Sequence, residues 1–234
     1  MADNYLEKKF EAMEHPAPKV VRKEGPTLDS LLIRNRSTRG FSHGRIVTLD
    51  ELRQIVAVNM HIASSKNQQA LRFKPVTAGP EADFVNKNIK MGALFRIKRA
   101  TVPASPDCPD LPVPGTEPQA FIVVYGTHPE DTGLLIDLGI SLQSMSLKAM
   151  ELGLNSLMIR AFNREAMLEL AGMPDSSLFP LAVLAIGKSA EKIFLVTTEG
   201  EASPSANPGG KPLDYFRKDG IHYVPKLALD KILI

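Results

Sequence analysis

Apolar residues recur every three or four positions along residues 131–152, the most regular pattern in this chain of 234 residues. Steps of three and four place side chains on one face of a helix, so the pattern predicts a long amphipathic helix. Gly153 is suited to end it, because glycine readily adopts the left-handed backbone that follows many helices. A helix with one rich apolar face fits either a domain core or a subunit interface. The apolar positions are Leu134, Leu135, Leu138, Leu142, Met145, Ala149 and Leu152.

Shorter helices are predicted where a capping side chain precedes apolar residues at helical spacing. Thr48 and Glu51 have the spacing of a capping box, in which each side chain bonds the other residue's backbone N–H. The expected helices are one that begins after Thr27, one after Thr48 that fades near Met60, one near residues 82–96, and one from Asn163 to Ala171.

Runs of β-branched and other apolar residues predict the strands. The longest runs are almost free of polar residues, which is typical of strands buried on both faces. Residues 197–213 are instead rich in proline, glycine, serine and threonine, which predicts a loop. The predicted strands are 72–77, 119–125, 156–159, 179–186 (ending at Gly187) and a short extended piece at 221–226.

These elements predict one α+β domain over residues 27–234, since the sequence has no internal repeat and no second apolar core. Residues 1–26 are polar and contain several prolines, so we expect them to form an N-terminal arm. A C-terminal arm is expected over about residues 195–234. Extended arms often exchange between protomers, which favours an oligomer.

The composition argues against several classes of function. The formal net charge of +2 is too small for a protein that binds nucleic acid over a broad surface. The single cysteine, Cys108, cannot form an intramolecular disulfide and fits a reducing compartment. The first residues lack the apolar core of a secretory signal, and no apolar run approaches the length of a membrane span. We therefore expect a cytoplasmic protein that binds neither nucleic acid nor membranes.

Positive charge is concentrated at one place in the sequence. Residues 34–39, which we call the basic segment, contain three arginines, a serine and a threonine but no acidic residue. Guanidinium groups and hydroxyls are donors that match the oxygens of a phosphate. The sequence contains no metal-ligand spacing, nucleophile elbow, P-loop or Gly-x-Gly-x-x-Gly run. This combination favours a phosphate-bearing cofactor that supplies its own chemistry.

Four segments between about residues 28 and 190 resemble, in order, motifs of the FMN-dependent nitroreductase family. The basic segment and the following Phe41 are similar to that family's Arg-Arg-Ser-x-Arg-x-Phe motif. Residues 46–52 resemble its Pro-Val-x-x-Glu-x-Leu helix start, and residues 63–69 its Ala-Pro-Ser-x-x-Asn-x-Gln-Pro-Trp segment. Residues 137–154 resemble its central helix and exit. The resemblance implies a nitroreductase-like fold, with a central mixed or antiparallel sheet flanked by helices and extended terminal arms.

The resemblance also implies an FMN site with four parts. The basic segment would hold the phosphate and the polar edge of the flavin. A polar loop would reach the flavin from the other subunit of a homodimer, a strand exit would pack on its back face, and a C-terminal lysine would meet the phosphate. No catalytic side chain and no metal are implied. The implied residues are Asn35, Arg36, Ser37 and Arg39; Ser64, Ser65, Asn67 and Gln69; Met158, Ile159, Arg160 and Ala161; and Lys226.

This sequence departs from the family pattern at three places. Asn35 stands where relatives usually have arginine, and Arg160-Ala161 where they often have Gly-Gly or Glu-Gly. Ala228 stands where some relatives have a second C-terminal cation. The first departure implies that one contact to the phosphate or ribityl group is weakened or supplied elsewhere. The second leaves the backbone contact possible but places a bulky cation near the ring or its rim.

The implied function is a ping-pong transfer of hydride from NAD(P)H through flavin N5 to a nitroaromatic, quinone or similar acceptor. Residues 84–118, which include a proline-rich loop, are expected to select the acceptor. Two alternatives stay open. Arg160 favours an FMN-binding relative with other flavin chemistry, such as dehalogenation or flavin fragmentation. The basic segment would also suit a flavin-free nucleotide-binding module.

Overall fold

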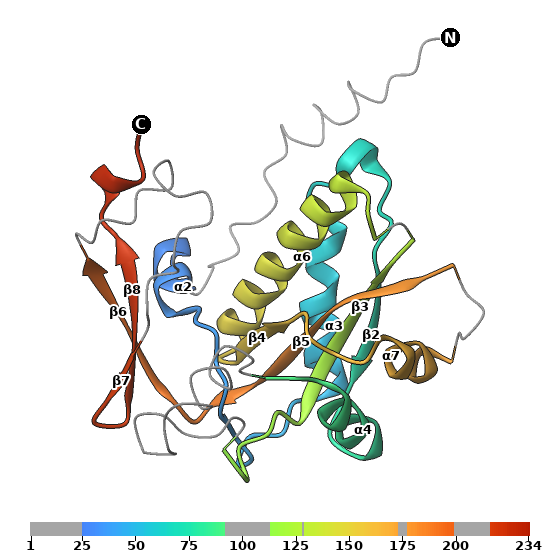
Figure 1. Cartoon of the computed structure of the whole chain (residues 1–234), viewed down its shortest axis with the longest axis horizontal. Helices are drawn as coiled ribbons and strands as arrows, with labels where there is room; N and C mark the ends of the chain where they lie inside the picture. Colours follow the sequence, from blue (N-terminus) through green and yellow to red (C-terminus); the bar gives the residue numbers. More distant parts are fainter. Residues whose placement is uncertain (1–24, 92–112, 128, 173–176, 199–215) are drawn as a thin grey trace, which may run out of the picture.

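The computed structural model describes residues 25–91, 113–127, 129–172, 177–198 and 216–234. Cys108, most of the predicted N-terminal arm and much of the 84–118 region lie outside these residues. The described parts form a layered body of helices and strands and a second, smaller sheet at the C-terminus (Figure 1).

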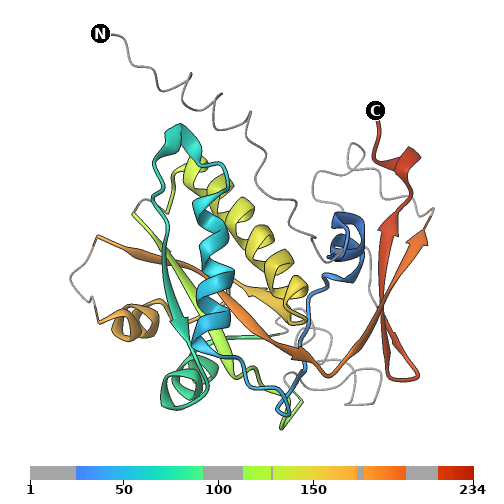
Figure 2. The same cartoon turned by 180° about the vertical axis from the view of Figure 1, so that it is seen from behind.

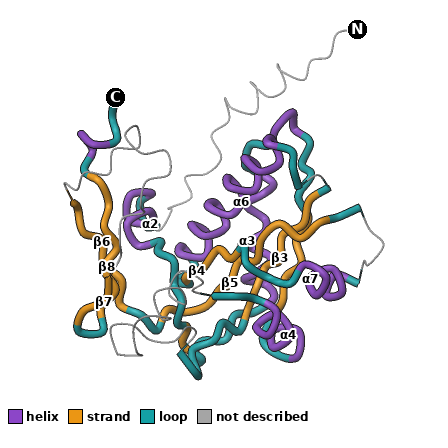
Figure 3. The backbone as a smooth tube through the Cα atoms, viewed as in Figure 1, coloured by secondary structure: helices purple, strands orange, loops and turns teal. Residues whose placement is uncertain are grey.

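The helices and strands follow the predicted order over most of the chain, as the tube in Figure 3 shows. The helices are α2 (Leu28–Arg34), α3 (Leu49–Ala57), α4 (Pro80–Asn88), α6 (Thr132–Glu151) and α7 (Arg164–Ala171), with short 3-10 helices η1 (Val58–Met60), η2 (Ser65–Asn67) and η3 (Leu229–Lys231). The strands are β1 (Phe41–Ser42), β2 (Arg72–Val76), β3 (Ala120–Gly126), β4 (Asn155–Ile159), β5 (Phe179–Ser189), β6 (Lys192–Thr198), β7 (Phe216–Lys218) and β8 (Ile221–Leu227).

The main sheet is antiparallel and buried on both faces. β5 lies at its centre, with β3 and then β2 on one side, while β4 and β1 also pair with β5. One core contains α3 and α6, and a second core contains α4 and α7. In Figure 2, α3 and α6 lie in front of the sheet. This double burial explains why β3 is apolar without alternation.

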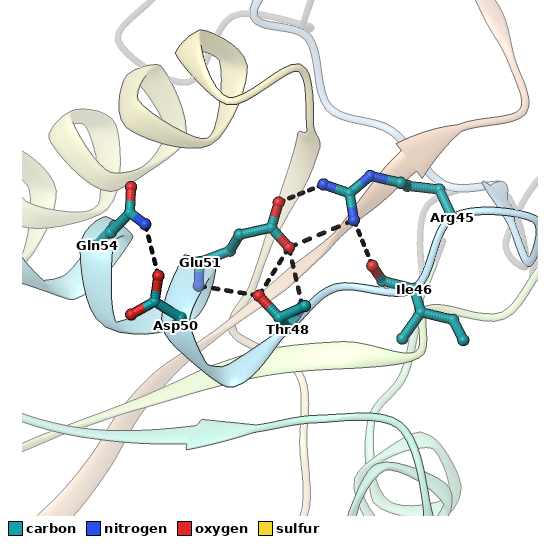
Figure 4. A network of polar contacts seen from close by, with 6 residues as sticks. All are labelled: Arg45, Ile46, Thr48, Asp50, Glu51 and Gln54. Atoms are coloured by element: carbon teal, nitrogen blue, oxygen red, sulfur yellow. Dashed lines mark hydrogen bonds and ion pairs between the residues drawn. The ribbon is translucent and has the colours of Figure 1, made fainter.

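Local capping signals determine where the predicted helices begin. Thr48 Oγ1 accepts from the Glu51 N–H at 3.2 Å, and the Glu51 carboxylate accepts from the Thr48 N–H at 2.9 Å. Figure 4 shows this capping box and the ion pair that Arg45 adds to it. Thr27, Asp131 and Asn163 cap α2, α6 and α7 through their side chains. The predictions for these helices are confirmed.

The helix predicted near residues 82–96 is present, but its predicted end is wrong. α4 begins at Pro80, a residue that suits the first turn because it needs no N–H partner. It ends at Asn88, because Ile89 forms a bridge with Phe162 and the Lys90 N–H donates to the Ala161 carbonyl at 2.7 Å. The backbone after α4 therefore pairs with the segment that follows β4.

The predicted end of the 179–186 strand at Gly187 is also wrong. β5 continues to Ser189, because Lys188 and Ser189 pair with β1. Gly187 has a packing role instead. A Cβ at this position would lie 2.9 Å from Cδ1 of Phe41, a ring that is buried to 2% exposure.

The C-terminal arm contains strands that the sequence patterns do not predict. β6 pairs in parallel with β8, and β8 pairs antiparallel with β7, giving a three-stranded sheet. Phe194 and Tyr223 stack across it, with ring centroids 6.3 Å apart. Only the piece at 221–226 was expected to be extended. Parallel pairing joins strands that are distant in sequence, so no local turn marks it.

Candidate functional site

The basic segment lies along an edge of the main sheet. Asn35 is the C-cap of α2, and its N–H donates to the Leu31 carbonyl at 2.8 Å. Ser37 then forms a parallel bridge with Ser156 of β4, and the Thr38 N–H donates to the Ser156 carbonyl at 3.0 Å. The Thr38 side chain is completely buried. The segment is thus fixed along the edge of β4 before it enters β1.

Arg36 carries a partly desolvated positive charge. One terminal nitrogen of its guanidinium donates to the Leu32 carbonyl at the end of α2. Its Nε is buried and has no hydrogen-bond partner among the described residues. Burial lowers the pKa of Arg36 below its ordinary value. A buried N–H of a cation without an acceptor costs free energy, so this position suits an anionic ligand.

Arg39 is held by groups from another part of the chain. Its backbone N–H donates to the Glu191 carboxylate at 2.6 Å, and its guanidinium donates to the Ser37 carbonyl at 3.3 Å. Glu191 also forms a buried ion pair with Arg217 of β7. Sequence reasoning missed Glu191, because no local pattern relates it to a residue 152 positions earlier.

The predicted residues 158–161 follow Ser156, the β4 residue that pairs with the basic segment, along the end of β4 and the segment after it. Met158 is 42% exposed, whereas Ile159 is buried in the core with α4 and α7, so its side chain cannot contact a ligand there. Arg160 and Ala161 are exposed. At about 3.3 Å per residue, Ser156 and Arg160 are separated by about 13 Å along the strand, within the length of an extended FMN.

The loop formed by residues 64–69, which we call the polar loop, has a strained backbone. Lys66, Asn67 and Gln69 have φ values of 50°, 54° and 49°, which are rare for residues other than glycine. The Gln69 N–H donates to Ser64 Oγ at 2.9 Å, which braces the loop from within. Ser64 and Gln69 also line a cavity of about 470 Å³ beneath the loop, with α3, η1 and β2 forming its other walls.

Asp137 of α6 fixes the polar loop. Its buried carboxylate accepts from the Ser65 N–H at 2.8 and 3.0 Å. This contact gives Asp137 a structural role, because it holds the loop against the N-terminal half of α6.

The structure brings together some of the predicted residues and separates others. The basic segment and β4 adjoin near the C-terminal end of α6, whereas the polar loop lies near its N-terminal end. Asp137 and Glu151 are about 21 Å apart along the helix axis at 1.5 Å per residue. Lys226 lies exposed on β8, in register with Thr197, and within the described residues its side chain forms no hydrogen bond or ion pair with the basic segment.

The described residues hold no group of three or more His, Cys, Asp or Glu side chains that could bind a metal ion. Within the same residues, no helix is both long enough and apolar enough to span a membrane.

Comparison with known proteins gives a consistent family and fold. The sequence model of the nitroreductase family matches residues 33–188. Similar solved structures include a nitroreductase family protein from Clostridium novyi NT, with 20% identity over 70% of this chain and 85% of that chain at a TM-score of 0.53. Another is the FMN and NADPH-dependent nitroreductase NfnB from Sphigopyxis sp. strain HMH, with 18% identity, 70% and 89% coverage and a TM-score of 0.54.

A third similar structure is the nitroreductase family protein from Streptococcus pneumoniae TIGR4, with 13% identity over 71% of this chain and 92% of that chain and a TM-score of 0.54. At these identities the structures establish a shared fold. No curated protein sequence matches the chain significantly.

Proposed function

This chain belongs to the nitroreductase family of oxidoreductases, and we propose that it binds FMN and passes hydride from NAD(P)H to a nitroaromatic, quinone or similar acceptor. The observation that carries this proposal is the basic segment on the edge of β4, where the buried Nε of Arg36 has no acceptor among the residues that the structure describes. A phosphate carrying close to two negative charges would supply that acceptor.

The residues of the basic segment carry the charge and the hydrogen-bond donors that the phosphate end of FMN needs. Arg36 supplies positive charge, and the exposed Ser37 hydroxyl supplies a donor. Charge-assisted bonds of this type are about twice as strong as neutral ones. Asn35 contributes no charge where relatives have arginine, so Arg36 carries a larger share of the attraction than it would in those relatives.

The rest of the site would orient the flavin. Bound FMN would supply the two-electron chemistry. Met158 offers an exposed apolar side chain beside the basic segment, and residues 159–161 offer backbone groups along the strand exit. Arg39 would favour negative charge at the polar edge of the ring. We assign no catalytic side chain, because solvent can supply protons to an open site.

We further propose that the enzyme is a homodimer with shared sites. The polar loop would then complete the site of the second copy, since it lies at the opposite end of α6 from the basic segment. Apolar residues on the outer face of α6 support this arrangement: Leu135 is 39% exposed and Ile136 is 59% exposed. Exposed apolar side chains gathered on one helix face are typical of a subunit interface.

Binding of FMN to purified variants tests the proposal. The wild-type protein should show the visible absorption of bound flavin, and NADH or NADPH should bleach it. Arg36→Ala should weaken FMN binding roughly 10- to 100-fold, since a charged hydrogen bond contributes about 1.5–3 kcal/mol. Lys226→Ala should change the Kd far less. Lys74→Ala, which removes an exposed cation paired with Glu81, is the control.

Several outcomes would count against the proposal. A protein that stays colourless after incubation with FMN would favour a flavin-free nucleotide-binding module. Bound flavin that neither nicotinamide bleaches would favour other flavin chemistry, for which the exposed Arg160 is the motivating feature. Equal FMN affinities for Arg36→Ala and Lys226→Ala would contradict the role given to Arg36.

A further inference from the structure

Glu191 joins the basic segment to the C-terminal sheet. It lies between β5 and β6, and one carboxylate oxygen accepts from the Arg39 N–H at 2.6 Å. The other oxygen pairs with the guanidinium of Arg217 on β7. The side chains of Arg217 and Glu191 are 10% and 9% exposed, so this pair is largely removed from water.

Neighbouring contacts restrict where Glu191 can lie. The Ala190 N–H donates to the Gly40 carbonyl at 2.9 Å, one residue beyond the Arg39 contact. Ser189 Oγ accepts from the Glu191 N–H at 3.0 Å. A Cβ on Gly40 would come within 3.3 Å of Cγ of Glu191. Arg39, the last residue of the basic segment, and the following Gly40 are therefore both tied to the β5–β6 connection.

The charges around Glu191 suit an anion site, although a carboxylate by itself would repel an anion. Arg217 neutralises that carboxylate, and Arg39 adds a further positive charge. His222 is buried beside the two arginines, and its pKa is lowered to about 4, mainly by burial and then by Arg217 and Arg39. It is therefore neutral near pH 7, so Glu191, Arg217 and Arg39 together carry a net charge of about +1 among the described residues.

We infer that Glu191 is a positioning residue for the basic segment, and that Arg217 makes this carboxylate compatible with an anionic ligand beside it. Through Arg217, which need not contact the ligand, the C-terminal sheet then influences the affinity of the site. This inference rests on the proposed FMN function for its ligand, whereas the positioning of the Arg39 backbone is independent of it.

Two charge-removing variants separate this role from that of an ordinary stabilising ion pair. Glu191→Gln keeps an acceptor oxygen for the Arg39 N–H and removes a negative charge, so the Kd for FMN should stay within about threefold of wild type or become tighter. Arg217→Gln leaves the carboxylate unneutralised, so FMN binding should weaken about tenfold or more. If the ion pair served stability alone, FMN binding should weaken to a similar extent in both variants.

Two further variants test the hydrogen bond to Arg39. Glu191→Ala removes the acceptor and should weaken FMN binding about tenfold. The exchange Glu191→Arg with Arg217→Glu restores an ion pair, but arginine cannot accept a hydrogen bond. FMN binding by the exchanged protein should therefore stay weak. Glu81→Ala, which breaks the surface pair with Lys74, is the matched control and should leave the Kd unchanged.

The experiment measures FMN binding by flavin fluorescence, together with amide hydrogen exchange over residues 35–41 in the FMN-free proteins. Exchange in this segment should be about five- to tenfold faster in Glu191→Ala than in Glu191→Gln, because a net hydrogen bond is worth about 1 kcal/mol. Equal exchange in these two variants, or equal loss of FMN affinity in Glu191→Gln and Arg217→Gln, would overturn the inference. Absence of FMN binding by the wild type would refute the proposed function alone, since the exchange comparison still decides the positioning role.

Discussion

His222 should make the stability of this protein fall in mild acid. Its side chain on β8 is 1% exposed, and burial together with Arg217 and Arg39 lowers its pKa from 6.5 to about 4, against an opposing effect of Glu191. The unfolded chain therefore binds a proton at His222 at higher pH than the folded chain does. The stabilisation is complete above about pH 6.5 and is lost as the pH falls towards 4.

The size of the effect follows from the difference between the two pKa values. Each unit of difference corresponds to about 1.4 kcal/mol, so the full loss below pH 4 is about 3 kcal/mol. Lowering the pH from about 7.5 to about 5 should reduce the free energy of unfolding by about 2 kcal/mol through this group. Such a change is a large fraction of the stability of an ordinary domain.

Urea unfolding at these two pH values measures the effect at fixed protein concentration. Between the two pH values, the free energy of unfolding of the wild-type protein should fall by about 2 kcal/mol more than that of His222→Gln, whose side chain does not titrate. His61→Gln, a change at an exposed loop position, should keep the wild-type pH dependence. The same pH dependence in wild type and His222→Gln would refute the reasoning, whatever the absolute stability of the variant.

Three further substitutions test other parts of the structure. Gly187→Ala should destabilise the protein by roughly 1–3 kcal/mol in urea unfolding, because its Cβ would meet the buried ring of Phe41 at 2.9 Å; Gly44→Ala, with 3.6 Å to its nearest neighbour, should have little effect. Asp137→Ala should cost about 1.5–3 kcal/mol, because it leaves a backbone N–H of the polar loop without its charged acceptor, and unchanged stability would contradict that role. Ile136→Glu, on the exposed face of α6, should shift the protein from dimer to monomer in light scattering, and an unchanged mass would argue against that interface.

Elements defined by short-range signals could be predicted from the sequence. The capping box of Thr48 and Glu51 and the Asn163 cap act over three residues, so their consequences do not depend on the rest of the fold. The apolar periodicity of residues 131–152 likewise predicts α6, although Leu135 lies partly outside the core face. The order of motifs around the basic segment is enough to predict the family.

Features defined by distant contacts could not be predicted in this way. α4 ends at Asn88 because the following backbone pairs with residues after β4, and nothing in residues 82–96 signals that partner. β6 carries a β-prone sequence, but its partner β8 lies beyond a long proline- and glycine-rich segment. Glu191 has no sequence feature that relates it to Arg39, since its role arises from the turn between two sheets.

The two parts of the proposed FMN site are each fixed firmly, and at opposite ends of the same helix. Asp137 anchors the polar loop near the start of α6, and Ser156 anchors the basic segment just after its end. Neither can move about 20 Å towards the other without breaking those contacts. A second copy related by a two-fold axis, with its α6 antiparallel to the first, would place its polar loop beside the basic segment. Because a two-fold interface is self-complementary, the same step would complete a second, identical site. The proposal that the polar loop completes the FMN site is therefore also a proposal that the site is shared between two subunits.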